Sequence, residues 1–136
     1  MGRLSLAVMV GLTAGCAVVS AQTPPASRLA NPASTRCIEQ GGTLRIERRP
    51  DGGEYGICVF ADNYQCEEWA MLRGQCPVGG LRVTGYVTAA ARYCAITGGR
   101  YAVTGRSGAV NEQGVCSLPG GKPCDANAYY SGACGR

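Results

Sequence analysis

Apolar and polar residues alternate along residues 43–48, where Leu44 and Ile46 fall on one face of an extended chain and polar residues on the other. This alternation predicts a half-buried strand. The sequence Pro-Asp-Gly-Gly at residues 50–53 predicts a turn, because proline presets φ and glycine permits a positive φ. A return strand is expected at residues 55–60, so the pattern predicts a β-hairpin.

A short helix is predicted on each side of this hairpin. The first begins at Asn31 and Pro32, since asparagine caps free backbone N–H groups and proline is tolerated in the first turn, and it is expected to run to about Gln40. The second is expected over residues 66–73, with acidic residues near its start and Arg73 near its end, as the helix dipole favours. The predicted order is helix, strand, strand, helix.

The same order recurs in the second half of the chain, around four similarly spaced cysteines. The spacing C-x20-C-x7-C-x9-C of residues 31–76 becomes C-x21-C-x7-C-x9-C in residues 88–136. The elements expected in the second copy are a helix capped by Thr88, strands at residues 100–104 and 113–118, and a helix at residues 125–130. Residues 77–87 are expected to link the copies, and part of residues 81–87 is a candidate for an extra strand.

The chain has nine cysteines in 136 residues, which is unusual for a protein of a reducing compartment. A unit as small as either copy cannot bury enough apolar surface to be stable without cross-links. Eight cysteines are therefore predicted to form disulfides: Cys37, Cys58, Cys66, Cys76, Cys94, Cys116, Cys124 and Cys134. The alternative is two four-cysteine zinc sites, but these usually contain C-x2-4-C pairs, which are absent here. The expected fold is α+β: two tandem small disulfide-stapled units, each helix–β-hairpin–helix.

Four cysteines allow three pairings in each copy. We expect the outer two of the first copy to pair, Cys37 with Cys76, and the inner two, Cys58 with Cys66, to close the strand-to-helix turn. The second copy is expected to follow the same rule. The chain-entropy model gives about 4 kcal/mol for the long loop and about 2.5 kcal/mol for the short one, so reduction is expected to unfold both copies.

The N-terminus resembles an export signal. Its apolar run at residues 4–14 is too short to span a bilayer and is typical of the hydrophobic region of a signal peptide. Two cleavage sites fit: one before Cys16, which resembles a bacterial lipobox and makes residues 1–15 the signal peptide, and one after Ala21, which makes it residues 1–21. In the first case Cys16 carries diacylglycerol through a thioether, and several acyl chains give stable anchoring.

Residues 16–30 are rich in loop-forming residues and are expected to form a flexible tether. Ala17 follows Cys16, and the lack of aspartate there resembles lipoproteins of the outer membrane. The expected location is the bacterial cell envelope, as an outer-membrane lipoprotein facing the periplasm or the exterior and bound to the membrane through its N-terminal lipid. The alternative is a soluble periplasmic or secreted protein.

Composition argues against several classes of function. The net charge is +4 and there is no basic run with interleaved aromatic residues, so no nucleic-acid partner is expected. The absence of histidine removes Ser-His-Asp and Cys-His catalysis. Glu67 and Glu68 are neighbours in a predicted helix and point about 100° apart, so helix-dipole matching explains them better than an acid–base pair. No catalytic residue, metal or cofactor is expected.

Three aromatic residues are candidates for a binding surface. Trp69 is the only tryptophan, and its simplest role is to pack the helix against the hairpin. Tyr129 and Tyr130 are adjacent in a predicted helix and cannot both face the core of their own copy. One of them is therefore expected to be exposed, as aromatic anchors at binding surfaces are. The partner expected is a protein or a cell-wall component.

The first copy contains Asn-Pro-Ala-Ser at residues 31–34, Gly-Gly at 41–42, Gly-Ile-Cys at 56–58 and Cys-Glu-Glu-Trp at 66–69. This pattern resembles a small exported bacterial domain of unknown function whose members often have the provisional label "hemolysin". The second copy has Asn127 where the pattern has tryptophan, and is more diverged. The resemblance implies no catalytic residues. The short strands, and the lack of another long apolar stretch, argue against pore formation.

Together these observations favour a non-enzymatic envelope protein with two rigid modules on a lipid tether, which serves in binding or envelope maintenance. The alternative is a secreted peptidase inhibitor, with residues 50–53 and 61–65 as candidate inhibitory loops. A third hypothesis is an enzyme, including a redox enzyme, which would need an exposed cysteine of low pKa.

Overall fold

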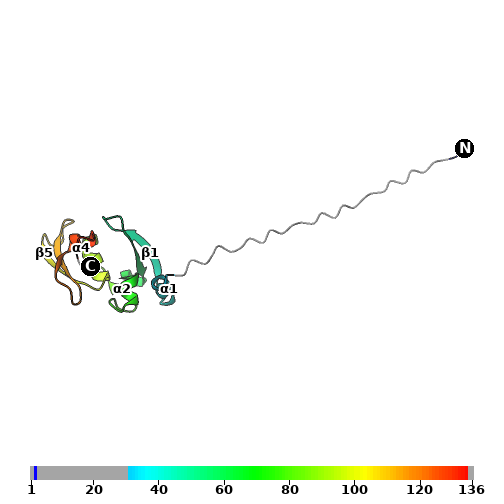
Figure 1. Cartoon of the computed structure of the whole chain (residues 1–136), viewed down its shortest axis with the longest axis horizontal. Coiled ribbons are helices and arrows are strands. Elements are labelled where there is room, and N and C mark those ends of the chain that lie inside the picture. The colour runs from blue at the N-terminus through cyan, green and yellow to red at the C-terminus, as the bar shows by residue number, and fades with distance from the viewer. Residues whose placement is uncertain (1, 3–30, 135–136) are drawn as a thin grey trace.

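The computed structural model describes residue 2 and residues 31–134 (Figure 1). Cys16, both predicted cleavage sites and the predicted tether lie outside the described residues. The first repeat consists of α1 (Pro32–Glu39), β1 (Thr43–Arg48), β2 (Glu54–Val59), the short 3-10 turn η1 (Ala61–Asn63), β3 (Tyr64–Glu67) and α2 (Glu68–Leu72). The second consists of α3 (Ala89–Ile96), β5 (Arg100–Gly105), β6 (Gln113–Ser117), β7 (Cys124–Asp125) and α4 (Ala126–Tyr130), with β4 (Leu81–Arg82) between the repeats. The α+β class and the two repeated units are confirmed, but each unit has a third strand before its second helix.

The helices begin where the capping residues predict. The side chain of Asn31 accepts a hydrogen bond from the backbone N–H of Ala33 at 3.0 Å, and Pro32 occupies the first turn of α1. Thr88 Oγ1 accepts from the N–H of Ala91 at 3.1 Å and starts α3. Both contacts satisfy N–H groups that a helix leaves without an internal partner, so these boundaries are set locally.

The first repeat contains a strand that the sequence pattern did not predict. Residues expected to begin the second helix instead form β3, which pairs antiparallel with β2 and places Cys66 opposite Cys58. The helix α2 starts only at Glu68, because the carboxylate of Glu67 accepts hydrogen bonds from the N–H groups of the next turn and caps it. The predicted helix over residues 66–73 was therefore too long at its start.

The residues expected to link the repeats include a strand. β4 pairs antiparallel with β3 and completes a four-stranded sheet in the order β1-β2-β3-β4. The N–H of Val83 then donates to the carbonyl of Asn63 at 3.1 Å, and the Val83 side chain is buried. The extra strand predicted within residues 81–87 is confirmed, and it fixes this segment to the first repeat.

The one-residue difference between the repeats lies in a β-bulge. In the first hairpin Ile46 pairs with Gly56, whereas in the second Val103 pairs with Gly114 and the register shifts before Gly105. Thr104 is the extra residue. A bulge absorbs one residue without changing the pairing of the remaining strand, so the cysteines of the two repeats keep equivalent positions.

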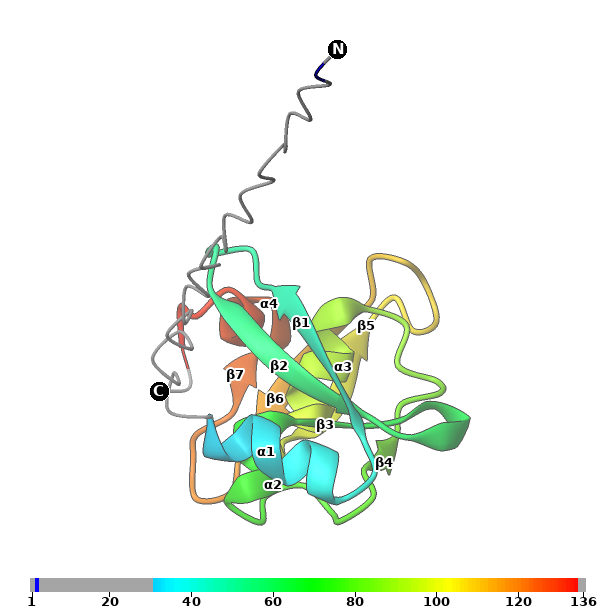
Figure 2. The ribbon, with the colours of Figure 1, turned by 90° about the vertical axis from the view of Figure 1, so that its right-hand side faces the viewer.

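The two repeats pack against each other around a shared core. A buried cluster combines Tyr55 and Ile57 of the first repeat with Tyr93 and Ile96 of the second, and Val83 completes it. Figure 2 shows the β1–β2 hairpin lying across the second repeat, with α3 and α4 behind it. A second buried cluster lies within the first repeat and is rich in cysteine sulfur.

Candidate functional site

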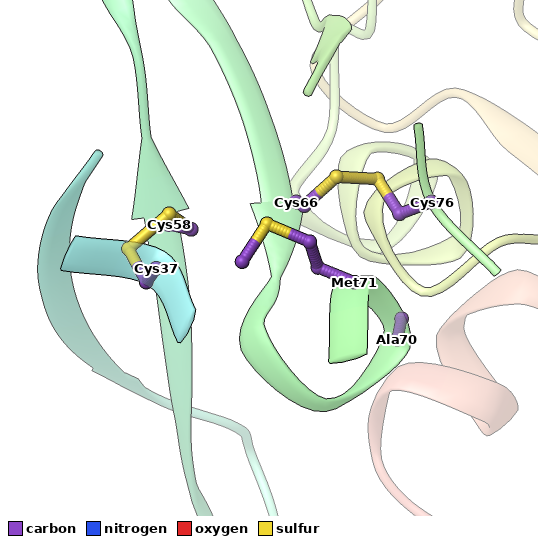
Figure 3. Packing of buried hydrophobic residues seen from close by; sticks show 6 residues of the cluster. All are labelled: Cys37, Cys58, Cys66, Ala70, Met71 and Cys76. Carbon is purple, nitrogen blue, oxygen red and sulfur yellow. A yellow bond between two sulfur atoms is a disulfide. The ribbon is translucent and has the colours of Figure 1, made fainter. Parts of the chain in front are cut away.

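All eight cysteines within residues 31–134 form disulfides, as predicted, but the predicted pairing is wrong. In the first repeat Cys37 bonds to Cys58 and Cys66 bonds to Cys76, with Cα–Cα distances of 5.5 and 5.9 Å (Figure 3). The second repeat follows the same rule, with bridges Cys94–Cys116 and Cys124–Cys134. The pairing is therefore first with second and third with fourth in each repeat.

The missed strand β3 explains this error. In the predicted arrangement, which lacks β3, only a turn separates residues 58 and 66, and a bridge between them would close that turn. With β3, Cys58 and Cys66 lie opposite each other on adjacent strands, and each reaches a cysteine outside the sheet: Cys37 on α1, or Cys76 after α2. Gly42 allows α1 to approach the sheet, because a Cβ at that position would collide with the sulfur of Cys58. Each bridge thus joins the sheet to a helix or to the segment that follows one.

The two equivalent C-x9-C bridges differ in exposure. Cys66 and Cys76 are 0% and 3% exposed, under Met71 and Leu81. Cys124 and Cys134 are only half-buried. They line a cavity of about 370 Å³ together with Cys116, Leu118, Gly121, Lys122, Pro123 and Tyr129. This cavity is a candidate binding site that the sequence pattern did not reveal.

Glu67 is a capping residue in the structure. Its carboxylate accepts hydrogen bonds from the N–H groups of Trp69 at 3.1 Å and Ala70 at 2.7 Å. Burial raises the pKa of Glu67, and these two N–H groups only partly offset it. Asp125 caps α4 in the same way, by accepting from the N–H of Ala128. The prediction that Glu67 stabilises the start of the helix is confirmed.

Glu68 joins the two helices of the first repeat. It is 5% exposed, and its two carboxylate oxygens accept hydrogen bonds from Asn31 Nδ2 at 3.1 Å and Ser34 Oγ at 2.6 Å. A Cβ at Gly56 would collide with the Glu68 side chain, so glycine at that position gives the carboxylate room. The carboxylates of residues 67 and 68 therefore have separate structural partners, and the second repeat has Ala126 where the first has Glu68.

Tyr129 and Tyr130 both pack against the shared core, so the expectation that one of them is an exposed anchor is wrong. Their ring centroids lie 5.2 and 5.1 Å from that of Tyr93, and both residues are half-buried. The hydroxyl of Tyr129 hydrogen-bonds to Thr97, and that of Tyr130 donates to the carbonyl of Arg48. Adjacent tyrosines of α4 can both be covered because the first repeat lies beside this helix.

An ion pair crosses from one repeat to the other. The guanidinium of Arg92 donates hydrogen bonds to both carboxylate oxygens of Glu47 and to Gln65 Oε1 at 3.2 Å. Tyr55 donates its hydroxyl to the same carboxylate at 2.9 Å. Burial alone would raise the pKa of Glu47, but the hydrogen bonds from Arg92 and Tyr55 outweigh it and hold this pKa below its ordinary value.

Trp69 is exposed, so the expectation that it packs the helix against the hairpin is wrong. Its exposed fraction is 41%, and that of Leu72, one turn further along α2, is 40%. The buried residues of α2 are Glu68, Ala70 and Met71. Trp69 therefore lies on the outer side of α2 as an apolar surface residue, whereas Tyr129 and Tyr130 lie between the repeats. The three candidate aromatic residues do not form one site.

The two candidate inhibitory loops form tight turns. Residues 50–53 form a tight turn in which the N–H of Arg49 donates to the carbonyl of Gly53 and Asp51 accepts from the N–H of Gly53. Residues 61–63 form a 3-10 turn, and Gln65 is buried in the sheet. Neither loop presents the extended backbone by which a peptide adds to a sheet edge.

Along residues 31–134, none of the helices is both long enough and apolar enough to cross a membrane. In the same part of the chain no cluster of three or more histidine, cysteine, aspartate or glutamate side chains has a geometry suited to a metal ion.

Comparison with known proteins identifies the repeated unit. A family model described as a domain of unknown function, DUF333, matches twice, at residues 28–75 and 85–133. The uncharacterized protein YoaF of Escherichia coli K12 is 38% identical over 69 residues, which cover 48% of this chain and 81% of the relative. YoaF of Shigella flexneri matches to the same extent. No solved structure matches. The chain therefore belongs to the DUF333 family and contains two tandem copies of its domain.

Proposed function

We propose that this protein is an exported, lipid-anchored component of the bacterial cell envelope that acts as a non-enzymatic binding module. The sulfur-rich core of the first repeat is the observation that carries the proposal. Four of its six buried residues are disulfide-bonded cysteines: Cys37, Cys58, Cys66 and Cys76. Such a core depends on oxidation, and disulfides persist outside the reducing cytoplasm.

The lipobox-like sequence that ends at Cys16 supports a lipid anchor at this residue. The four bridges use eight of the nine cysteines, so a lipid on Cys16 requires no change in the disulfides. A thioether-linked diacylglycerol with further acylation holds a protein stably on a membrane. The membrane is then the partner of the N-terminus, and the folded repeats extend from it.

The roles of the buried carboxylates support a non-enzymatic function. Glu67 caps α2, Glu68 binds α1 and Glu47 pairs with Arg92, so each has a structural partner. The sequence has no histidine that would serve as a general base near neutral pH. The exposed Trp69 and the cavity beside Cys124–Cys134 are the surfaces that we assign to binding. Pore formation and peptidase inhibition are not part of this proposal.

Intact mass spectrometry of the protein purified from bacterial membranes, without reduction, tests location and chemistry together. We expect the mass of a chain cleaved before Cys16, increased by diacylglycerol and an additional acyl chain and lowered by eight hydrogen atoms for four disulfides. The Cys16→Ser variant is the matched control, and it should lose the lipid and leave the membrane fraction while keeping all four bridges. An unlipidated chain that begins after Ala21, or a chain with free thiols, would overturn the proposal.

A further inference from the structure

The cavity beside Cys124–Cys134 corresponds to a filled position in the first repeat. Beyond the bulge, each residue of the second repeat matches the residue 58 positions earlier in the first. The cavity residues Leu118, Pro123, Cys124, Tyr129 and Cys134 thus match Phe60, Gln65, Cys66, Met71 and Cys76. The two repeats share the fold at this point, so the occupant in one repeat indicates what fits in the other.

In the first repeat the occupant is the segment that leads into β4. Leu81 packs against the sulfur-rich cluster of the first repeat and lies opposite Gln65 in the sheet. Gly80 is buried beside it, and a Cβ at that position would collide with the backbone of Gln65 and the ring of Phe60. A turn that ends in a glycine of positive φ (+83°), followed by an extended large aliphatic residue, therefore fills this position.

In the second repeat, no described residue takes this place. β7 pairs with β6 on one side and has no further partner among residues 31–134, whereas β3 has both β2 and β4. The result is the cavity of about 370 Å³ and the half-buried Cys124–Cys134 bridge. Lys122 and Pro123, which match the residues of β3 that pair with β4, precede β7 and line the cavity, so their backbone lies where a bound segment would run.

Two side chains define the chemistry of the occupant. Lys122 takes the position of Tyr64, which lies opposite Arg82 in the first repeat, so a cation faces the residue that follows the aliphatic one. An acidic residue complements this charge. Pro123 takes the position of Gln65 and has no N–H to donate, so the aliphatic side chain has to supply most of the affinity.

We propose that this cavity binds a segment of a partner protein in which a glycine in a turn is followed by an extended leucine and then by an acidic residue. The leucine enters the cavity against Leu118, Tyr129 and the Cys124–Cys134 bridge, and the acidic side chain pairs with Lys122. This inference rests on the binding role proposed above and names the class of partner. Its test uses purified oxidised protein, so its failure leaves the test of export and lipidation unaffected.

The probe is an acetylated and amidated hexapeptide, Pro-Val-Gly-Gly-Leu-Glu, titrated into ¹⁵N-labelled oxidised full-length protein. We expect the chemical shifts of the backbone amides at residues 116–134 to change and to saturate as peptide is added, as for a ligand that binds weakly. A peptide with aspartate in place of leucine should bind at least tenfold more weakly. Absence of saturation at millimolar peptide, or equal binding of both peptides, would overturn the proposal.

A charge exchange tests the position of the acidic residue. The wild-type protein should prefer the peptide ending in glutamate to one ending in arginine by about threefold, the size expected of an exposed ion pair. Lys122→Glu should reverse this preference. The control Arg106→Glu changes the net charge equally at the other end of the β5–β6 hairpin and should leave the preference unchanged. If Lys122→Glu fails to reverse it, or if protein concentration alone shifts the same amides, the assignment to a partner peptide is wrong.

Discussion

The guanidinium of Arg92 on α3 binds both carboxylate oxygens of Glu47 on β1, which lies 45 residues earlier in the sequence. This contact joins the two repeats. Both side chains are mostly buried, at 20% and 25% exposure. A pair of this kind contributes more than a surface ion pair, because removal of one partner leaves a poorly solvated charge. Neither residue has an equivalent in the other repeat, where Thr35 takes the position of Arg92 and Gly105 that of Glu47.

Arg92→Met should destabilise the protein by about 2 kcal/mol, since Glu47 keeps its charge and loses its main donor. Glu47→Gln should cost less, because the amide oxygen still accepts from Tyr55. Denaturant unfolding of both variants and of the double variant measures the coupling between the two residues. A coupling energy near zero would show that the pair does not stabilise the contact between the repeats.

The contribution of Glu47 should depend on pH with a definite sign. Its folded-state pKa lies below the ordinary value of 4.5, so its stabilising effect is complete above that value and is lost as the pH falls through the folded-state pKa. The stability difference between wild type and Glu47→Gln should therefore be largest near neutral pH and shrink in acid. Unfolding curves measured across this range test it, and a difference that grows on acidification would contradict the lowered pKa.

The two C-x9-C bridges should respond differently to a reductant and to removal. Both span ten residues, so the chain-entropy model assigns each a similar effect of about 2.5 kcal/mol. The double variant Cys66→Ala/Cys76→Ala should nevertheless lose more stability than Cys124→Ala/Cys134→Ala, because only the first opens a space in a buried cluster.

With limiting dithiothreitol, we expect Cys124–Cys134 to be reduced first, since its sulfurs are the more accessible to an attacking thiolate. Alkylation and peptide mapping identify the reduced pair. Early alkylation of Cys66 and Cys76 would show that burial does not govern the order of reduction.

Ser34→Ala should destabilise the protein by about 1 to 2 kcal/mol, because it leaves a buried Glu68 oxygen without its hydrogen-bond donor. The neighbouring Thr35→Ala is the matched control, since Thr35 is exposed on the same helix and should change stability by less than about 0.5 kcal/mol. Thermal unfolding of the two variants compares them directly. Equal effects would mean that helix propensity, and not the contact between α1 and α2, determines the result.

Trp69→Asn, which introduces the residue found at position 127 in the second repeat, should change stability by no more than about 0.5 kcal/mol. Because Trp69 is the only tryptophan, its fluorescence reports this site alone, and acrylamide should quench it readily in the folded wild-type protein. Strong protection from quenching, or a large loss of stability in the variant, would show that the side chain belongs to the core.

Local signals predicted the elements that local contacts determine. Asn31 and Thr88 marked the starts of α1 and α3, because a cap needs only the next few residues. The alternation of apolar and polar residues in β1 was sufficient to locate the strand. It did not predict which side chains are buried, since Ile46 is 53% exposed. The repeat itself predicted that both halves share one architecture.

The errors on β3, on the disulfide pairing and on the two tyrosines of α4 depend on distant contacts. β3 is a strand because β2 and β4 pair with it, and no pattern within residues 64–67 indicates this. The disulfide pairing then follows from β3. The number and spacing of the cysteines alone were therefore insufficient to predict it. The exposure expected for Tyr129 or Tyr130 applies to one repeat alone, whereas in the structure Tyr55 of the first repeat packs against Tyr130.

The cluster of Tyr55, Ile57 and Tyr93 has a consequence for molecules that carry a single copy of this domain. One repeat of this sequence by itself would expose these side chains to water or need a second molecule to cover them, and that cover would depend on protein concentration. Duplication within one chain makes the association intramolecular, so it persists at any dilution. The tandem protein can therefore remain folded at low abundance, where two separate repeats would dissociate.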